Sequence, residues 1–382
     1  MAAGGGLPLD WLRHRFELSR GSAAHNVRPM EGLRGFAVFL VFLVHFASLA
    51  SPWLSPGSSL EAVFGAMQAV GNAGVDLFFV LSGYLIYGSL MSRHQRFAGF
   101  MARRIERIYP TFTVVLAIYL ALSFAFPAES KMPGSFWGGL VYLVQNFLLL
   151  PGIFNINPMI MVAWSLSYEM FYYLIVPAAI ALLGLRERTT RWRVAFFLIV
   201  AMATALYCAL HGGHVRLIMF LSGMLLHEAM ADDALVAPGG AVGVAGLMGG
   251  LLANLLPVAG DLGLALKTTV LFVAFLALCL ACFRNPHAGL SRAFSWTPLR
   301  WLGNMSYSYY LLHGLVLKAC FHALAVVVPP GSAGLPAWVL WALLPTLFTI
   351  TLLPSAALFL AVERPFSLAP RPRQVPRLRV MG

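Results

Sequence analysis

Residues 28–45 read RPMEGLRGFAVFLVFLVH: a polar, basic start followed by an apolar run from Phe36 that a single histidine interrupts. Arg34 and His45 are eleven residues apart, so on a helix both lie on one face, about 16 Å from each other. Polar groups inside a membrane are costly and usually functional. Either this pair takes part in chemistry, or the arginine snorkels to the membrane edge and the histidine bonds to a neighbouring helix.

The composition indicates an integral membrane protein. The 382 residues are 60% hydrophobic and 10% charged, with a mean hydropathy of +0.80, whereas soluble proteins carry about 25% charged residues. The net charge of +12 comes almost entirely from arginine, since there are 23 arginines and 3 lysines. These arginines lie between apolar runs, which argues against nucleic-acid binding. We expect one all-α polytopic domain surrounded by membrane lipids, with no bound cofactor or metal.

Apolar runs follow one another along the whole chain. A helix needs about twenty residues to cross the membrane, and the fourth run is short and interrupted by Gln145 and Asn146. The eleven runs are 36–50, 69–91, 108–126, 136–151, 162–184, 193–210, 215–231, 239–258, 264–283, 301–328 and 336–362. The number of crossings therefore depends on whether residues 136–151 span the membrane.

The distribution of arginine predicts that they do not. If the N-terminus is cytoplasmic and residues 136–151 do not cross, 22 of the 23 arginines face the cytoplasm and only Arg216 does not, as the positive-inside rule requires. The sequence thus predicts about ten crossings, both termini cytoplasmic, and a re-entrant or interfacial fourth run. We expect a cytoplasmic segment 1–27, a transmembrane domain 28–366 and a basic cytoplasmic tail 367–382, with disorder over residues 365–382.

This topology assigns a depth to the polar residues inside the spans. His45 lies about ten residues into the first span from the cytoplasmic side, and His313 lies a similar distance into the tenth apolar run, 301–328. Asp76 and Glu169 enter their spans from the outer side. We therefore expect two histidines near mid-membrane, with arginines on the inner face and carboxylates in the outer half.

The chain resembles membrane-bound acyltransferase family 3 from about Arg28 to Phe366, because six motifs occur in the family's order. The motifs are RPMEGLRGFAVFLVFLVH (28–45), GNAGVDLFFVLSGYLI (71–86), FxxRRxxRIYP (100–110), WSLSYEMFYY (164–173), SYSYYLLH (306–313) and ERPF (363–366). Glu31 stands where the family usually has Asp before GLRG, which conserves the charge. Many relatives carry a further extracytoplasmic hydrolase-like domain, and this chain resembles the stand-alone form.

The resemblance implies transfer of an acyl group, usually acetyl from acetyl-CoA as co-substrate, to hydroxyls of surface polysaccharides, peptidoglycan or signalling oligosaccharides. The family's Arg-x10-His pair corresponds to Arg34 and His45. A histidine suits this chemistry because it is substantially neutral near pH 7 and can accept the hydroxyl proton. We predict that His45 is the general base or a transient acyl carrier. Arg34 binds the donor's phosphates, orients Glu31, or only anchors the topology.

Three arginines at the start of the third span are candidates for binding acyl-CoA. Coenzyme A carries several phosphate charges, and Arg103, Arg104 and Arg107 form a compact cationic group that suits them. Arg104 and Arg107 are three residues apart and share a helix face. The alternative is positive-inside signalling, which needs arginine only as charge.

A site for a carbohydrate or lipid-linked glycan acceptor is expected toward the outer side. Sugars stack on aromatic rings and are held by carboxylates, which favours Trp164, Tyr168 and Glu169. The two aromatic residues are also typical of any membrane interface, whereas Glu169 and Asp76 each need a partner inside a span. The remaining candidates for this pocket are Ser82, Tyr84, Tyr310 and His313.

Several of these candidates have a structural alternative. Ser82, Gly83 and Tyr84 can serve close helix packing through the small residues. His313 can form an interhelical hydrogen bond, which we favour over a role in the pocket.

Two other functions compete with acyl transfer. A transporter of lipid-linked sugars or small solutes could use the intramembrane histidines and carboxylates as a proton relay, but no internal repeat of the kind that transporters often show is visible. The HEAMAD of residues 227–232 fits the His-x4-Asp pattern of glycerolipid acyltransferases, without the other motifs expected beside it. We therefore predict an O-acyltransferase.

Overall fold

The chain folds into a bundle of α-helices. The computed structural model describes residues 8–18, 27–331 and 335–368, and these contain no β-strand. Eight helical segments of the described chain are long and apolar enough to cross a membrane, which confirms an all-α polytopic membrane protein; the ten crossings and the cytoplasmic termini stay predictions. The α-helices in these residues are α1 (Pro8–Phe16), α2 (Val27–Ala50), α3 (Ser59–Gly71), α4 (Ala73–Met91), α5 (Phe97–Ala125), α6 (Phe136–Phe147), α7 (Trp164–Leu182), α8 (Thr190–His211), α9 (Ile218–Ala231), α10 (Gly240–Ala253), α11 (Gly260–Arg284), α12 (Gly289–Phe294), α13 (Thr297–Asn304), α14 (Ser306–Val327) and α15 (Ala337–Leu358).

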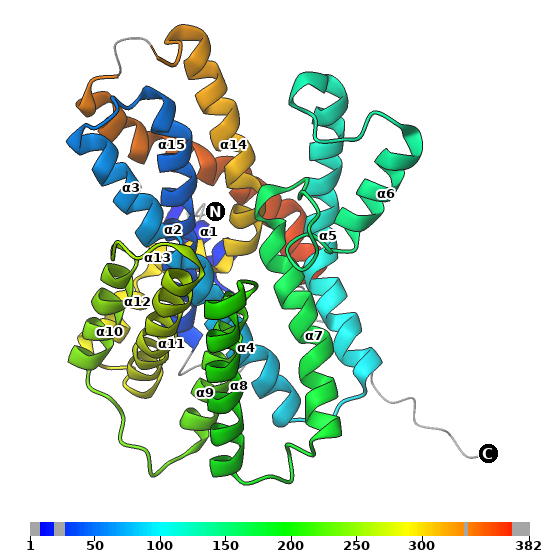
Figure 1. The fold of residues 1–382 in the computed structure, drawn as a ribbon, viewed down its shortest axis with the longest axis vertical. Coiled ribbons are helices and arrows are strands. Elements are labelled where there is room, and N and C mark those ends of the chain that lie inside the picture. The colour runs from blue at the N-terminus through cyan, green and yellow to red at the C-terminus, as the bar shows by residue number, and fades with distance from the viewer. Residues whose placement is uncertain (1–7, 19–26, 332–334, 369–382) are drawn as a thin grey trace, which may run out of the picture.

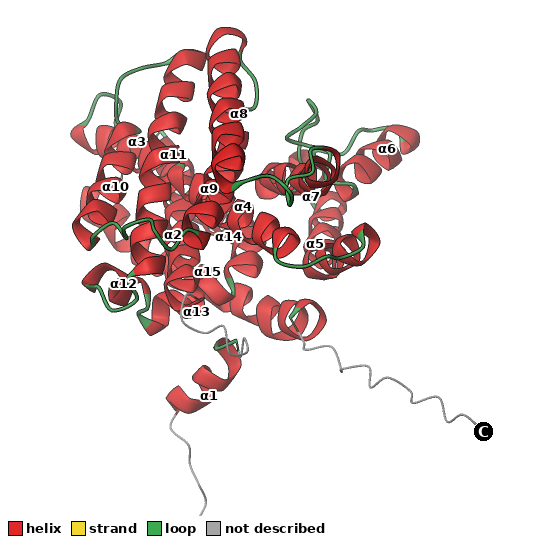
Figure 2. Cartoon of the chain, turned by 90° about the horizontal axis from the view of Figure 1, so that it is seen from below, coloured by secondary structure: helices red, strands yellow, loops and turns green. Residues whose placement is uncertain are grey.

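Helices α2, α4 and α14 lie at the centre of the bundle. Figures 1 and 2 show α10, α11 and α12 on one side of this centre and α5, α6 and α7 on the other. Helices α2 and α14 run parallel, since Arg34 bonds to Ser306 and, further along both helices, His45 lies beside His313. Arg34 and His45 therefore share the face of α2 that meets α14.

Pairs of glycines let neighbouring helices cross at short distance. A Cβ built on Gly83 of α4 or on Gly223 of α9 would lie within 2.1 Å of a carbonyl oxygen of the other helix. Gly35 of α2 and Gly303 of α13 meet in the same way, with Cβ positions within 2.0 Å of the opposite backbone. Only a residue without a side chain fits there, so the packing interpretation of Gly83 is confirmed.

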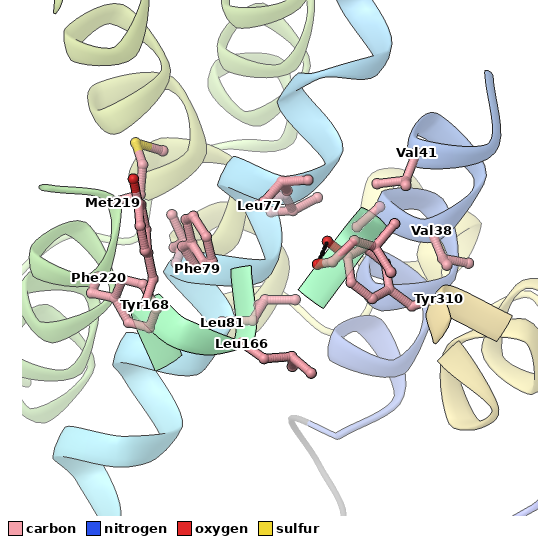
Figure 3. Packing of buried hydrophobic residues seen from close by; sticks show 14 of the residues in the cluster. Val38, Val41, Leu77, Phe79, Leu81, Leu166, Tyr168, Met219, Phe220 and Tyr310 are labelled. Carbon is pink, nitrogen blue, oxygen red and sulfur yellow. Dashed lines mark hydrogen bonds between the residues drawn. The ribbon is translucent and has the colours of Figure 1, made fainter. Parts of the chain in front are cut away.

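Side chains of α4 fill the core on both of its sides (Figure 3). Phe79 stacks on Tyr168 of α7 and on Phe220 of α9, with ring centroids 5.6 and 4.7 Å apart. Val38 of α2 and Tyr310 of α14 lie together on the other side of the view. Helix α4 therefore holds the α2–α14 pair against α7 and α9.

The fourth apolar run contains only a short helix. Helix α6 has 12 residues, about 18 Å at 1.5 Å per residue, against a hydrocarbon core of about 30 Å. Its N-terminus is capped by Ser135, whose hydroxyl accepts the Gly138 N–H at 3.1 Å. The loop after it is fixed by Asn146, whose Oδ1 accepts the Met159 N–H at 2.7 Å. As a helix, α6 is too short to cross by itself, in agreement with a re-entrant or interfacial segment.

Helix α15 continues without a break into a π-helical segment, η5 (Phe359–Ser367). Segment η5 packs against α5 and carries Glu363, which is fully buried. π-Helical turns are rare and frequently occur at functional sites. Here the turn places a carboxylate beside the arginines of α5.

The predicted terminal segments are only partly covered. Within residues 1–27, helix α1 ends in Phe16, whose ring stacks on Phe359 at 5.5 Å. The disorder predicted for residues 365–382 is wrong for residues 365–367, which belong to η5, and residues 369–382 lie outside the described residues.

Candidate active site

A cavity of about 200 Å³ lies between α2, α4, α5, α7 and α14. It combines positive guanidinium groups, hydroxyl groups and one carboxylate in an otherwise apolar interior. Six residues of the polar lining were predicted from the sequence: Arg34, Ser82, Arg104, Arg107, Glu169 and Tyr310. The other four are Ser165, Tyr173, Ser306 and Tyr307.

Arg107 is held by the buried carboxylate of Glu363. Its Nη1 donates to Glu363 Oε1 at 2.7 Å, and its guanidinium lies 5.6 Å from the ring centre of Tyr307. The second oxygen, Oε2, accepts from the backbone N–H and the hydroxyl of Ser308, at 3.0 and 2.6 Å. Because both oxygens of Glu363 are occupied, the carboxylate is fixed and Arg107 is oriented along the cavity wall.

Arg34 lies on α2 and reaches the cavity at the start of α14. Its Nη2 donates to the hydroxyl of Ser306 at 2.9 Å, and its guanidinium lies 5.9 Å from the ring centre of Phe78. The first residue of α14 thus positions the arginine of the Arg-x10-His pair.

Arg104 lines this cavity and also a second, basic one. The second cavity has a volume of about 630 Å³ and lies where α4 ends and α5 begins. Arg93, His94 and Arg103 contribute to its wall, and Arg103 bonds to Gln95. The Arg104 guanidinium lies 5.3 Å from the ring centre of Tyr173. The three arginines proposed for donor binding are therefore distributed over two adjoining cavities that share Arg104.

Glu169 is the carboxylate of the first cavity. Its Oε1 accepts from the hydroxyl of Tyr173 at 2.5 Å and from that of Ser82 at 3.5 Å. No cation of the described chain forms an ion pair with it within 4.0 Å. Its partners inside the span are thus hydroxyl groups, and the carboxylate is partly exposed.

The two histidines form a pair next to the cavity. The ring centroids of His45 and His313 are 5.1 Å apart, which confirms that they lie at one depth. Neither lines the cavity; Tyr310 does, and its ring centre is 6.2 Å from that of His313. The interhelical hydrogen bond expected of His313 is not formed among the described residues: Nδ1 bonds to the Tyr309 carbonyl of its own helix at 2.8 Å, and Nε2 has no partner there.

Glu31 and Asp76 lie away from the cavity in buried ion pairs. Glu31 Oε2 accepts from Nε of Arg300 on α13 at 3.0 Å. Asp76 Oδ2 accepts from Nη1 of Arg216 at 3.0 Å. The one arginine that the predicted topology leaves on the outer side is thus matched by a carboxylate that was expected on that side.

The aromatic candidates also point elsewhere. Tyr168 bonds through its hydroxyl to His214 Nδ1 at 2.7 Å, and Trp164 packs edge-on against Tyr168 at 5.4 Å. Tyr84 packs against His227 and Phe283. The residues proposed as one acceptor site therefore divide: Glu169 faces the cavity, whereas Tyr168 contacts His214 in the loop before α9 and Trp164 packs against Tyr168 and Phe79.

The HEAMAD motif has a structural explanation. Glu228 is buried and accepts from Arg193 through both oxygens, at 2.8 and 2.7 Å, and from the hydroxyl of Tyr87 at 2.5 Å. His227 packs against the rings of Tyr84 and Tyr87. The Oδ1 of Asp232, the aspartate of the motif, accepts the Ala234 N–H at 3.0 Å, so His227 and Asp232 each have a structural partner of their own.

Sequence reasoning missed Glu363 as a residue of the site. The ERPF motif contained it, and a carboxylate at the end of an apolar run needs a partner. That reasoning was applied to Asp76 and Glu169 and not to the chain's last carboxylate. The serines at the start of α14, Ser306 and Ser308, were also missed.

Comparison with known proteins identifies the family. Residues 29–360 match the family model Acyl_transf_3, described as an acyltransferase domain. The chain therefore belongs to the acyltransferase 3 family. No solved structure matches it.

Three similar proteins are named as O-acetyltransferases. The chain is 25% identical over 338 residues to the peptidoglycan O-acetyltransferase OatA of Listeria monocytogenes, covering 79% of this chain and 51% of that protein. It is 25% identical over 317 residues to the O-acetyltransferase OatA of Staphylococcus aureus (74% and 49%). It is 26% identical over 337 residues to the putative peptidoglycan O-acetyltransferase YrhL of Bacillus subtilis (76% and 48%). The chain spans about half the length of these relatives.

Proposed function

We propose that the protein is an O-acetyltransferase of the bacterial inner membrane, which moves an acetyl group from acetyl-CoA to a hydroxyl of a carbohydrate such as peptidoglycan or another surface polysaccharide. Family membership and the names of the relatives support this class of reaction. The observation that carries the donor assignment is the basic cavity that shares Arg104 with the cavity inside the bundle.

The phosphates of coenzyme A bind in the basic cavity. Arg93 and Arg103 contribute guanidinium groups there, and guanidinium groups bind phosphate oxygens in bidentate fashion. The pantetheine arm then passes Arg104, Arg107 and Arg34 through the inner cavity, and the thioester lies at the Tyr310 end of that cavity, toward His45. The side chains of Ser306 and Glu363 hold Arg34 and Arg107, respectively, which fixes both guanidinium groups at the wall of that cavity.

His45 acts as the general base of the transfer. It takes the proton of the acceptor hydroxyl as the hydroxyl oxygen forms a bond to the thioester carbonyl carbon. The carbon–sulfur bond then breaks, and the coenzyme A thiolate leaves and takes up the proton from His45. General base catalysis of this kind contributes about 10²–10⁴-fold to a rate.

The acceptor approaches the side of His45 that faces away from His313, since the His45 ring is partly exposed. Glu169 accepts hydrogen bonds from other hydroxyls of the sugar. Tyr310 separates the inner cavity from the histidine pair, so its ring must move aside when the acyl group meets the acceptor.

Acetyl-CoA turnover by the purified protein in lipid nanodiscs tests the proposal. Thiol release reports the reaction, with extracted cell-envelope glycans as mixed acceptor and mass spectrometry of the products. We expect glycans that gain one acetyl unit, a loss of kcat by at least about 100-fold in His45→Ala, and a raised KM for acetyl-CoA in Arg104→Ala. Arg188→Ala is the matched control, because Arg188 is exposed and lines neither cavity.

Two outcomes count against the proposal. If no acyl-CoA yields free thiol with any glycan, while the protein binds sugars, a transporter explains the intramembrane polar groups better. If folded His45→Ala turns over like the unmodified protein, the acetyl transfer stands and His45 is not its base.

A further inference from the structure

His313 presents one nitrogen without a partner to the interior of the bundle. The side chain is fully buried, and its Nδ1 lies 2.8 Å from the Tyr309 carbonyl oxygen. A carbonyl oxygen only accepts, so Nδ1 carries the hydrogen and Nε2 of the neutral ring has a free lone pair. No described residue donates to Nε2. Because buried acceptors in native proteins are nearly always hydrogen-bonded, we expect Nε2 to receive a hydrogen bond.

The side chains around His313 leave one candidate donor. The Tyr309 hydroxyl is bonded to Thr351 Oγ1 at 2.8 Å, and Thr351 in turn donates to the Phe348 carbonyl. The Tyr310 hydroxyl is bonded to Ser165 at 2.8 Å. Both phenol groups are thus occupied elsewhere.

His45 is the third ring that contacts His313. The centroids are 5.1 Å apart and the rings are tilted by 56°. At this separation the facing edges of two imidazoles lie within hydrogen-bond range when a nitrogen of one points at a nitrogen of the other. The distance therefore permits a hydrogen bond in which an N–H of the partly exposed His45 ring faces Nε2.

We propose that His313 is a positioning residue, whose Nε2 accepts the N–H of His45 and thereby fixes which nitrogen of His45 is the base. This inference rests on the proposed role of His45. With one nitrogen of His45 donating to His313, the other has its lone pair directed away, toward the approaching hydroxyl. Fixing a base through its second nitrogen is the general logic of catalytic histidines.

The same bond supports the reaction as the proton moves. When His45 takes the hydroxyl proton, its ring becomes a cation, and its N–H to Nε2 becomes a charge-assisted hydrogen bond, which is the stronger kind. The proton stays on His45 until the thiolate leaves, because its transfer to Nε2 would move the positive charge onto the fully buried ring of His313.

Two substitutions separate this role from a structural one. The amide of His313→Asn reaches the position of Nδ1 and keeps a donor for the Tyr309 carbonyl, but offers no acceptor to His45. The amide of His313→Gln reaches the position of Nε2 and keeps the acceptor. We expect kcat to fall about 100-fold in His313→Asn and to stay within about tenfold in His313→Gln, with an unchanged KM for acetyl-CoA in both and melting temperatures that show folded protein.

Nitrogen NMR of the ¹⁵N-histidine protein in nanodiscs gives a readout independent of activity. In the unmodified protein we expect a single tautomer for His45 and a coupling across the N–H to N bond between the two rings. His313→Asn is expected to leave His45 as a mixture of tautomers.

Three results would overturn the positioning role of His313. Equal loss of kcat in the two variants, or a kcat near that of the unmodified protein in His313→Asn, would overturn the positioning role. So would a spectrum without the coupling between the rings, a test that needs no variant and no turnover. If the unmodified protein releases no thiol, the proposed function fails, and the spectrum still decides whether the histidines are bonded.

Discussion

Each fully buried carboxylate of the described bundle is matched by an arginine from a distant part of the chain. The pairs are Glu31–Arg300, Asp76–Arg216, Glu228–Arg193 and Glu363–Arg107. Burying two charges is costly, and removing one partner leaves the other uncompensated, which is worse than removing both. Three of these pairs lie outside the inner cavity, and only the pair of Glu363 brings an arginine, Arg107, to its wall.

The pair of Asp76 and Arg216 permits a test of this rule. Asp76→Asn is expected to lower the free energy of unfolding by about 3–5 kcal/mol, because it leaves Arg216 without its counter-charge. Arg216→Gln should cost a similar amount. The double variant is expected to recover part of the loss, which thermal unfolding in nanodiscs measures. Losses that simply add would mean that the two side chains do not interact.

Glu363 is expected to act on donor binding through Arg107. Glu363→Gln removes the charge that orients Arg107, so we expect the KM for acetyl-CoA to rise about tenfold or more, as loss of one charge-assisted hydrogen bond implies. Glu228→Gln is the matched control: it breaks an equally buried pair with Arg193, and neither residue lines the inner cavity. Both variants should lose stability, and only the first should change KM. An unchanged KM in folded Glu363→Gln would assign Arg107 to structure alone.

Residue spacing predicts which side chains share a face of one helix, but it does not predict which side chains of another helix they contact. The eleven-residue spacing of Arg34 and His45 placed both on one face, and both do meet α14. Arg107 and Glu363 are 256 positions apart, and no periodicity relates them. Which carboxylate finds which arginine is decided by how the helices pack.

The crossing of α4 and α9 provides a test at the level of the elements. A Cβ on Gly83 would lie 2.1 Å from the Phe220 carbonyl oxygen, so Gly83→Ala must push the two helices apart, at a cost of about 3 kcal/mol. We expect a lower melting temperature and a lower yield of folded protein. Gly249→Ala in α10 is the control, because nothing lies within 4 Å of its Cβ position. Equal behaviour of the two variants would contradict the close crossing.

Helix α7 shows that neighbouring residues of one sequence motif can lie on different faces of a helix. WSLSYEMFYY reads as one aromatic and acidic group, yet residues 168 and 169 point about 100° apart on a helix. Tyr168 consequently joins the core beside Phe79, and Glu169 faces the cavity. The sequence indicated that both are inside a span, and only the positions of α4 and α14 show which of them borders the cavity.

The distribution of arginines across the predicted topology is consistent with the ion pairs of the structure. The predicted topology leaves one arginine, Arg216, on the outer side, and that arginine is paired with Asp76. A paired arginine carries no net charge to that face, so it does not weaken the bias by which cytoplasmic arginines orient a membrane protein. The same topology depends on α6 not crossing.

Cysteine labelling tests that topology directly. In a variant whose four native cysteines are replaced, Ala128→Cys precedes α6, Asn157→Cys follows it, and Glu187→Cys lies in the loop between α7 and α8; all three positions are exposed. If α6 does not cross, a membrane-impermeant maleimide added to intact spheroplasts should label the first two and leave Glu187→Cys unlabelled until the membrane is opened. Because α6 is only about 18 Å long, we expect identical labelling on its two sides. Labelling of one flank alone would show that the segment crosses, and every later loop would then change sides.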